Sequence, residues 1–385
     1  MKKLRVGIIG MGFVGVLHLD AISRIGNAEV IAVADTNLDL AKNKAEEYGI
    51  KYYCSSIEEM IEHAELDVIH NCTPNFLHKD INIYVLEHGI HLFSEKPLAR
   101  NLQEVSEIMD VLPKHPELIT GINHCYRMNP MVQEMKLKIK NGEIGVPRLV
   151  HGSYLQDHLL YETDYNWRIN PEINGPSRAI ADIGVHWMDI VQYILDDQIT
   201  EVCSDLVTVM PMRKKPKGEV ATFSKNVNTD YEDVEITTED YGSVLFRTKS
   251  GIHGVYYVSQ VSAGHGCYLN FEIDGSEASF AWNQEKPNEV WMGRKDGPNC
   301  IFDRNPVSLT DFVAANYTHL AKGHPEGWND ALRNNITSFY NYILEGKDPQ
   351  KERPEFSTFQ EAFYLTKLVE AILKSSETGS WIKIE

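Results

Sequence analysis

Three glycines near the start of the chain constrain the fold of its first part. Gly10, Gly12 and Gly15 follow an apolar, β-branched segment at residues 4–9 and precede a helical pattern that begins at Phe13. In a strand–turn–helix unit, the first glycine permits a tight turn and the second lets backbone N–H groups approach a bound anion. The third lets the helix pack closely on the strand. The pattern therefore predicts an anion-binding turn at a helix N-terminus.

The segments that follow alternate between apolar strands and helical patterns. Strands are expected at residues 4–9, 29–34, 67–72, 90–94 and 117–121, and helices at 13–25, 38–48, 75–87 and 102–112. This alternation predicts an α/β Rossmann domain with a doubly wound parallel sheet, at residues 1–125. Consecutive strands with short turns predict an α+β domain with a large, mostly antiparallel open sheet at residues 126–385. Its C-terminal helix is able to pack back on the Rossmann domain.

An acidic residue ends the second expected strand. Asp35 lies 20 residues after Gly15, where the adenosine ribose of a dinucleotide is expected. Its carboxylate can bind ribose hydroxyls and repels a 2′-phosphate, and the following Thr36 and Asn37 supply no arginine for such a phosphate. The cofactor predicted is NAD rather than NADP.

Charge excludes several classes of partner. With 37 Lys and Arg against 55 Asp and Glu, the chain has a net charge of −18, which disfavours nucleic acids and anionic membranes. The basic run at residues 213–217 is interpreted as a solvated loop. The uncharged segment 6–19 is interrupted by glycines and is shorter than a membrane span, so neither a signal peptide nor a membrane helix is expected.

Cysteines and histidines give no sign of a metal. Six scattered cysteines without a Cys-x-x-Cys pair favour reduced thiols and a cytoplasmic location. No metal is predicted, because no ligand spacing relates the histidines His18, His63, His70, His88, His91 and His115.

Three further motifs carry a family resemblance. They are Asn71-Cys72-Thr73-Pro74-Asn75-x-x-His78, Glu95-Lys96-Pro97, and Ala181-Asp182-Ile183-Gly184-Val185-His186-Trp187-Met188-Asp189. In this order and spacing they resemble the glucose-fructose oxidoreductase/inositol dehydrogenase (Gfo/Idh/MocA) family over essentially the whole chain. Segments around Gln156, 166–168 and 323–329 look like those of its levoglucosan dehydrogenase-like members.

The resemblance implies a catalytic group of Lys96, Asp182 and His186. Asp182 and His186 fall in a helix expected at residues 178–195, where positions i and i+4 share a face. In the oxidation of a secondary alcohol, His186 would accept the hydroxyl proton, and Asp182 would orient the His186 imidazole. Lys96 would stabilise the developing alkoxide. Asp189 also matches the family pattern, either in function or as a helix anchor.

The resemblance also implies two sets of binding residues. Those for the cofactor are Gly10, Gly12, Phe13, Val14, Gly15, Asp35, Thr36, Asn37, Cys72, Thr73, Pro74, Asn75, His78, Glu95, Lys96, Asn123 and Arg168. Those for the substrate are Tyr126, Arg127, Gln156, Trp167, Asp182, His186 and His324. Tyr126 departs from the family pattern, because many members carry arginine there. His78 is alternatively a polar residue on the helix surface.

The expected function is NAD(H)-dependent transfer of hydride between a secondary hydroxyl or ketone of a cyclic sugar or polyol and the nicotinamide. The usual oligomeric state of the family and the open sheet predict a homodimer or homotetramer. Two alternatives remain open: an NAD-dependent glycoside hydrolase with a transient oxidation–elimination cycle, and a non-catalytic NAD-binding regulator of the same fold. The presence of Lys96 and His186 favours the dehydrogenase.

Overall fold

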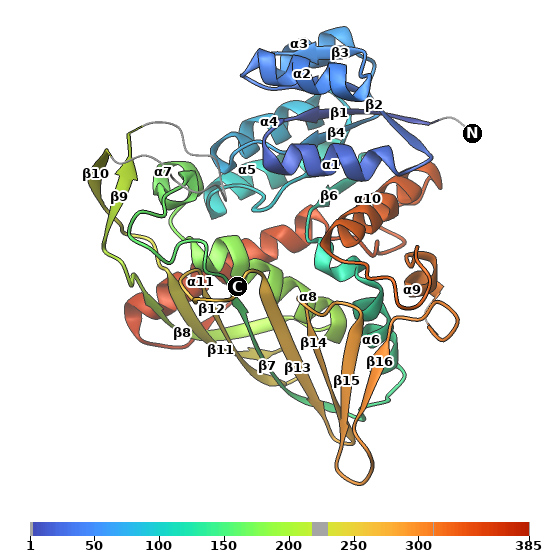
Figure 1. Ribbon diagram of the computed structural model, residues 1–385, viewed down its shortest axis with the longest axis vertical. Helices are drawn as coiled ribbons and strands as arrows, with labels where there is room; N and C mark the ends of the chain where they lie inside the picture. The colour runs from blue at the N-terminus through green and yellow to red at the C-terminus, as the bar shows by residue number, and fades with distance from the viewer. Residues whose placement is uncertain (1–2, 218–229, 311, 385) are drawn as a thin grey trace. The chain divides into compact units, whose positions relative to one another are not determined.

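The computed structural model describes residues 3–217, 230–310 and 312–384 (Figure 1). The chain forms two compact units. The first comprises Met1–Cys125 and Asn329–Tyr364, and the second Tyr126–Trp328 and Leu365–Glu385. The structure groups Asn329–Tyr364 with the first unit, whereas the boundary expected from the sequence assigns these residues to the second domain.

The first unit is built on a six-stranded parallel sheet. Its strands are β1 (Leu4–Ile9), β2 (Ala28–Ala34), β3 (Tyr52–Cys54), β4 (Val68–Asn71), β5 (His91–Ser94) and β6 (Thr120–Ile122). Its first helices are α1 (Phe13–Ser23), α2 (Leu38–Tyr48), α3 (Ile57–His63), α4 (Asn75–Glu87), α5 (Leu102–Val111) and η1 (Leu112–Lys114). The order β3-β2-β1-β4-β5-β6, with every neighbouring pair parallel, confirms the doubly wound sheet.

Late segments of the chain complete this unit because they bury its far edge. Phe339 of α10 (Trp328–Leu344) packs on Phe93 of β5, with ring centroids 5.1 Å apart. Ser357 forms an isolated antiparallel bridge with Ile122 of β6. These long-range apolar contacts give no periodic signal, so a boundary drawn along the sequence misses them.

The second unit contains a nine-stranded sheet of order β16-β15-β14-β13-β7-β12-β11-β8-β17. Its strands are β7 (Pro147–Leu155), β8 (Ile199–Val207), β11 (Tyr241–Thr248), β12 (His253–Ser259), β13 (Tyr268–Gly275), β14 (Ala278–Asn283), β15 (Glu289–Arg294), β16 (Cys300–Asp303) and β17 (Ile382–Lys383). Only the β7–β12 pair is parallel, which confirms a large, mostly antiparallel sheet.

The remaining elements are short helices, three longer ones and a two-stranded antiparallel sheet. They are η2 (Cys125–Met128), α6 (Pro130–Lys140), η3 (Trp167–Ile169), α7 (Pro171–Asn174), η4 (Ile180–Gly184), α8 (Val185–Leu195), β9 (Met212–Pro216), β10 (Tyr231–Glu235), α9 (Phe312–Asn316) and α11 (Phe359–Thr378). Helix α11 begins in the first unit and ends in the second. All six cysteines are free, and no helix of the described residues is long and apolar enough to cross a membrane.

The structure contradicts the prediction that the basic run at residues 213–217 is a solvated loop. Residues 212–216 form β9, which pairs with β10, and Arg213 is completely buried. Its guanidinium donates to the Asp240 carboxylate at 2.8 Å and to the carbonyls of Tyr161 and Asp164 at 2.9 and 3.2 Å. Arg213 therefore ties the 161–164 loop to the sheet, a role that depends on partners far away in sequence.

Candidate active site

Each glycine of the turn meets a different local constraint. Gly10 has φ +89°, and a Cβ there would lie 2.6 Å from the carbonyl oxygen of Cys72. A Cβ on Gly15 would lie 1.9 Å from the carbonyl oxygen of Gly10, so α1 approaches the turn as closely as its backbone allows. At Gly12, the N-cap of α1, a Cβ would meet nothing within 4 Å.

The N-terminus of α1 is consequently open and fits an anionic group. No side chain caps it, and its first turn contains no acidic residue. The backbone N–H groups and the dipole of a helix N-terminus favour a phosphate. Phe13, the first residue of the helix, is exposed, and Val14 follows it. This geometry suits the pyrophosphate of a dinucleotide.

Asp35 is linked to the glycine turn as well as to its own loop. One carboxylate oxygen accepts from the Met11 N–H at 2.7 Å and the other from the Asn37 N–H at 2.9 Å. Asn37 in turn caps α2 by accepting from the Leu40 N–H. Thr36 and Asn37 are exposed, so the end of β2 is accessible beside the turn.

The loops after β4 and β5 are held together by a buried histidine. His78 of α4 lies within 2.8 Å of the Thr73 carbonyl oxygen and 2.7 Å of the Pro97 carbonyl oxygen. Burial lowers the pKa of His78, and its two carbonyl partners oppose that shift. The structure therefore supports a positioning role between these loops rather than the alternative of a surface polar residue. Lys96 precedes Pro97 at the carboxyl end of β5.

A chain of buried polar side chains surrounds Glu95. His18 Nε2 lies 2.9 Å from the Glu95 carboxylate, and His18 Nδ1 lies 2.9 Å from His70 Nδ1. His70 Nε2 then lies 2.8 Å from the Tyr340 hydroxyl. Asn123 donates to the same Glu95 oxygen at 2.5 Å.

This chain keeps a carboxylate ionised inside the protein. Burial by itself raises the pKa of Glu95, but the hydrogen bonds from His18 and Asn123 and the charge of Lys96 outweigh it. The pKa of Glu95 is thus held below its usual value. The other Glu95 oxygen accepts from the Lys96 backbone N–H at 3.3 Å, so the network also orients the Lys96 backbone.

In the second unit, a buried carboxylate organises the start of the helix that bears the Asp182/His186 pair. Glu239 accepts from the Ser177 hydroxyl and from the N–H groups of Arg178 and Ile180, at 2.7, 2.9 and 3.0 Å. After this anchor, Ile180–Gly184 form a π-helical turn before α8 begins. The helix expected at residues 178–195 is therefore present, but its first part is π-helical rather than α-helical. Turns of this kind are frequent at functional sites.

Asp182 and His186 each have close partners in this unit. Gln260 donates to one Asp182 oxygen at 2.8 Å, and the Arg168 Nε lies 3.6 Å from the other. The His186 ring meets the Tyr126 ring edge to face, with centroids 5.1 Å apart. Arg168, which the resemblance assigns to the cofactor, thus lies next to the Asp182 carboxylate.

Tyr126, which occupies a position where many family members carry arginine, is part of a cluster of hydroxyl and sulfur groups. Its hydroxyl lies 2.9 Å from the Tyr154 hydroxyl and 3.4 Å from the Cys267 sulfur. Gln156 donates to the Tyr154 hydroxyl at 3.5 Å. The structure therefore brings Tyr126, Gln156 and His186 together. Burial raises the pKa of Tyr154, so its hydroxyl keeps its proton.

Several residues of this cluster were missed at the level of the sequence. Tyr154, Gln260 and Cys267 lie in or beside strands. The alternation of apolar and polar residues in a strand predicts only that such residues pack in the sheet. His158 was missed too, and burial lowers its pKa to about 4, so it is neutral.

The other predicted substrate residues are placed differently. Arg127 makes a buried, two-pronged ion pair with Asp189 at 2.7 and 2.6 Å, which supports the anchoring interpretation of Asp189. The Arg168 guanidinium lies over the Trp167 ring at 4.4 Å. His324 has an exposed side chain, and its carbonyl accepts a hydrogen bond from a buried arginine, Arg304.

Comparisons with known proteins agree with the motifs. Residues 4–122 match the model of an oxidoreductase family with an NAD-binding Rossmann fold, and residues 132–281 match the GFO/IDH/MocA C-terminal domain. Levoglucosan dehydrogenase of Pseudarthrobacter phenanthrenivorans is 27% identical, with 100% of this chain and 99% of that protein covered. 1,5-Anhydro-D-fructose reductase of Ensifer adhaerens is 30% identical over 83% of this chain and 89% of that protein.

Solved structures show the same fold at lower identity. A levoglucosan dehydrogenase in complex with NADH and L-sorbose superposes with a TM-score of 0.88 at 24% identity, covering 100% of both chains. An oxidoreductase domain protein from Kribbella flavida has the same TM-score, identity and coverage. The two-domain architecture is therefore shared along the whole chain.

Proposed function

Since the chain belongs to the Gfo/Idh/MocA family and is an NAD-binding oxidoreductase, we propose that it transfers hydride between a secondary hydroxyl or ketone of a cyclic sugar or polyol and the nicotinamide. The observation that carries the substrate class is full-length similarity to an enzyme named for levoglucosan. An inositol 2-dehydrogenase from Rhizobium meliloti, 25% identical over 90% of both chains, supports the same class.

The proposed chemistry divides acid–base work among three residues. NAD, when bound, supplies the hydride acceptor. His186 takes the proton of the reacting hydroxyl, and Asp182, held by Gln260, favours the imidazolium that forms. Lys96 donates a hydrogen bond to the developing alkoxide, and the Glu95 network fixes its backbone. Tyr126 and Gln156 provide hydroxyl and amide groups for the substrate.

The proposed cofactor site follows the carboxyl edge of the parallel sheet. The open N-terminus of α1 receives the pyrophosphate, and Asp35 receives the adenosine ribose and disfavours a 2′-phosphate. The remaining residues proposed to line it are Thr36, Asn37, Cys72, Thr73, Pro74, Asn75, His78, Glu95, Lys96, Asn123 and Arg168.

The open face of the nine-stranded sheet supports a homo-oligomer. Leu245 lies opposite Val255, which lies opposite His151 on the next strand, so these side chains share one face. Leu245 and Val255 are 49% and 40% exposed, and Ile301 near the sheet edge is 63% exposed. Apolar side chains of this extent favour coverage by a second copy. We propose that the protein is a cytoplasmic homodimer or homotetramer. Light scattering would measure the mass of this assembly.

The test is a panel of sugars and inositols offered with NAD and with NADP, with the appearance of reduced cofactor as the signal. Lys96→Ala should lower kcat at least about a hundredfold while the variant still binds NAD. Lys114→Ala, an exposed lysine of the same unit, is the control and should behave as the native protein. Full activity of Lys96→Ala would refute the role of Lys96.

The same panel separates the two alternatives. If no compound reduces the cofactor but nitrophenyl glycosides release nitrophenol in the presence of NAD, the protein is a glycoside hydrolase. If NAD binds but neither reaction occurs, the regulator is supported and the dehydrogenase is wrong.

A further inference from the structure

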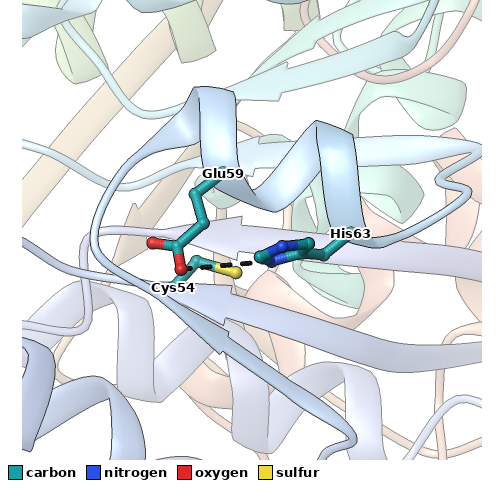
Figure 2. A group of neighbouring side chains, drawn as sticks. All are labelled: Cys54, Glu59 and His63. Carbon is teal, nitrogen blue, oxygen red and sulfur yellow. Dashed lines mark ion pairs between the residues drawn. The ribbon is translucent and has the colours of Figure 1, made fainter.

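A cysteine, a glutamate and a histidine that the site described above does not use converge at the end of β3. Cys54 is the last residue of β3, and Glu59 and His63 lie one turn apart on α3. One ligand atom from each lies within 4.8 Å of the other two, and the Glu59 Oε1 is 4.0 Å from the His63 Nδ1. Figure 2 shows the three side chains pointing toward one another. Spacing among the histidines alone does not predict this group, because its other two members are a cysteine and a glutamate.

Hydrogen bonds and strand pairing hold two members of this trio, Glu59 and Cys54, in place. The second Glu59 oxygen accepts from the Ser55 N–H at 2.7 Å and the Ser55 hydroxyl at 2.8 Å, which fixes the carboxylate with Oε1 turned to His63. Cys54 pairs with Ala34 in the parallel sheet, and its carbonyl accepts from the Asp35 N–H. Hydrogen bonds to the outer oxygen of a ligating carboxylate are the usual support of a metal site.

We propose that Cys54, Glu59 and His63 bind a divalent metal of borderline softness, for which Zn²⁺ is the expected ion, with water as the fourth ligand. Thiolate, imidazole and carboxylate are the zinc ligands of proteins, and bond lengths of about 2.0–2.3 Å in a tetrahedron separate ligand atoms by about 3.3–3.8 Å. The observed separations, all within 4.8 Å, need to close by up to about 1.5 Å. Rotation of the His63 side chain, which is 54% exposed, can shorten its separations from the other two ligand atoms.

The position of the trio explains why a water would complete the site. The Cys54 side chain is buried beneath α3, whereas Glu59 and His63 reach solvent. A metal held by them would have protein on one side and water on the other, as in three-ligand zinc sites. The proposal is independent of the oxidoreductase function, because none of the three residues belongs to the proposed catalytic or cofactor groups.

Another possible ligand group lies on the outer face of the second unit. His151, Glu272 and Asp274 also have ligand atoms within 4.8 Å of one another, but they offer only nitrogen and oxygen. Sulfur therefore distinguishes the proposed site. Cobalt(II) is the probe of choice, because a cobalt–thiolate bond gives a charge-transfer absorption band that carboxylate and imidazole ligands do not.

The experiment titrates the full-length, reduced protein with Co²⁺, reads the thiolate band, and then displaces the metal with Zn²⁺. The native protein should develop the band with one equivalent of Co²⁺ and lose it when Zn²⁺ is added. Cys54→Ser should abolish the band, and His63→Ala should weaken Co²⁺ binding at least tenfold. Cys300→Ser and His88→Ala, a cysteine and a histidine outside the trio, should match the native protein.

Two results would overturn the proposal. One is a native protein without a thiolate band, and the other is a band that persists in Cys54→Ser. Because His63 is largely exposed, His63→Ala should keep the native melting temperature, so it tests the site even if Cys54→Ser does not fold. An unchanged Co²⁺ affinity in folded His63→Ala would mean that this side chain is not a ligand.

Discussion

Replacing Gly12 by alanine should separate folding from cofactor binding. The residue has φ −69° and ψ −165°, which alanine adopts freely, and the added methyl group would meet no atom within 4 Å. Alanine is a poorer N-cap than glycine by a few tenths of a kcal/mol to about 1 kcal/mol. It also restricts the unfolded chain, which stabilises by about 0.4–1 kcal/mol. The free energy of unfolding should therefore change by less than about 1 kcal/mol.

Binding of NAD should respond much more strongly. The open space at Gly12 is where the pyrophosphate must approach the N–H groups of α1, and a methyl group there keeps it away. A hydrogen bond to a charged group contributes about 1.5–3 kcal/mol. Losing one such bond corresponds to a Kd for NAD about 10 to 100 times higher.

Calorimetric titration with NAD and thermal melts of the free protein measure both quantities. Gly26→Ala is the matched control, because a methyl group there also meets nothing within 4 Å and Gly26 lies beyond the other end of α1. It should bind NAD with native affinity. If Gly12→Ala melts and binds NAD like the native protein, the pyrophosphate does not lie at this turn and the proposed location of the cofactor is wrong.

Gly15→Ala should destabilise the protein by about 1–3 kcal/mol, because its methyl group would lie 1.9 Å from the carbonyl oxygen of the turn, and urea unfolding measures this loss. Tyr340→Phe leaves the buried His70 nitrogen without its partner and should cost about 1–3 kcal/mol in the same assay. Tyr342→Phe, the same change on the same helix at a hydroxyl that meets only a backbone carbonyl, should cost less, and an equal loss would contradict a special role for the network. Asp35→Ala should reduce the preference for NAD over NADP in kcat/KM, and an unchanged ratio would remove the argument for that preference.

The parts of the site that depend on local geometry could be predicted from the sequence. Gly10 and Gly15 are required by contacts within one strand–turn–helix unit, so their spacing carries the information. The strand-end positions of Asp35 and Lys96 follow from the alternation of strands and helices, because parallel strands end at one edge of the sheet. Predicting these positions required no knowledge of contacts between residues distant in the sequence.

Other features could not be predicted because their partners are remote in sequence. His18, His70 and Tyr340 form one chain although more than 250 residues separate the last two. Arg213 is part of a basic run whose composition indicates solvent, yet Asp240 and two carbonyls surround it. Composition describes a residue's own preference, whereas burial depends on what packs against it.

Periodicity and motif spacing are properties of neighbouring residues, so the two-domain fold, the family and the glycine turn could be predicted before any coordinates were known. The coordinates were needed to find that Asn329–Tyr364 join the first unit, that a π-helical turn precedes α8, and that Cys54 lies close to His63. A folded chain satisfies buried polar groups and covers apolar surfaces with any segment that reaches them, however distant that segment is along the sequence.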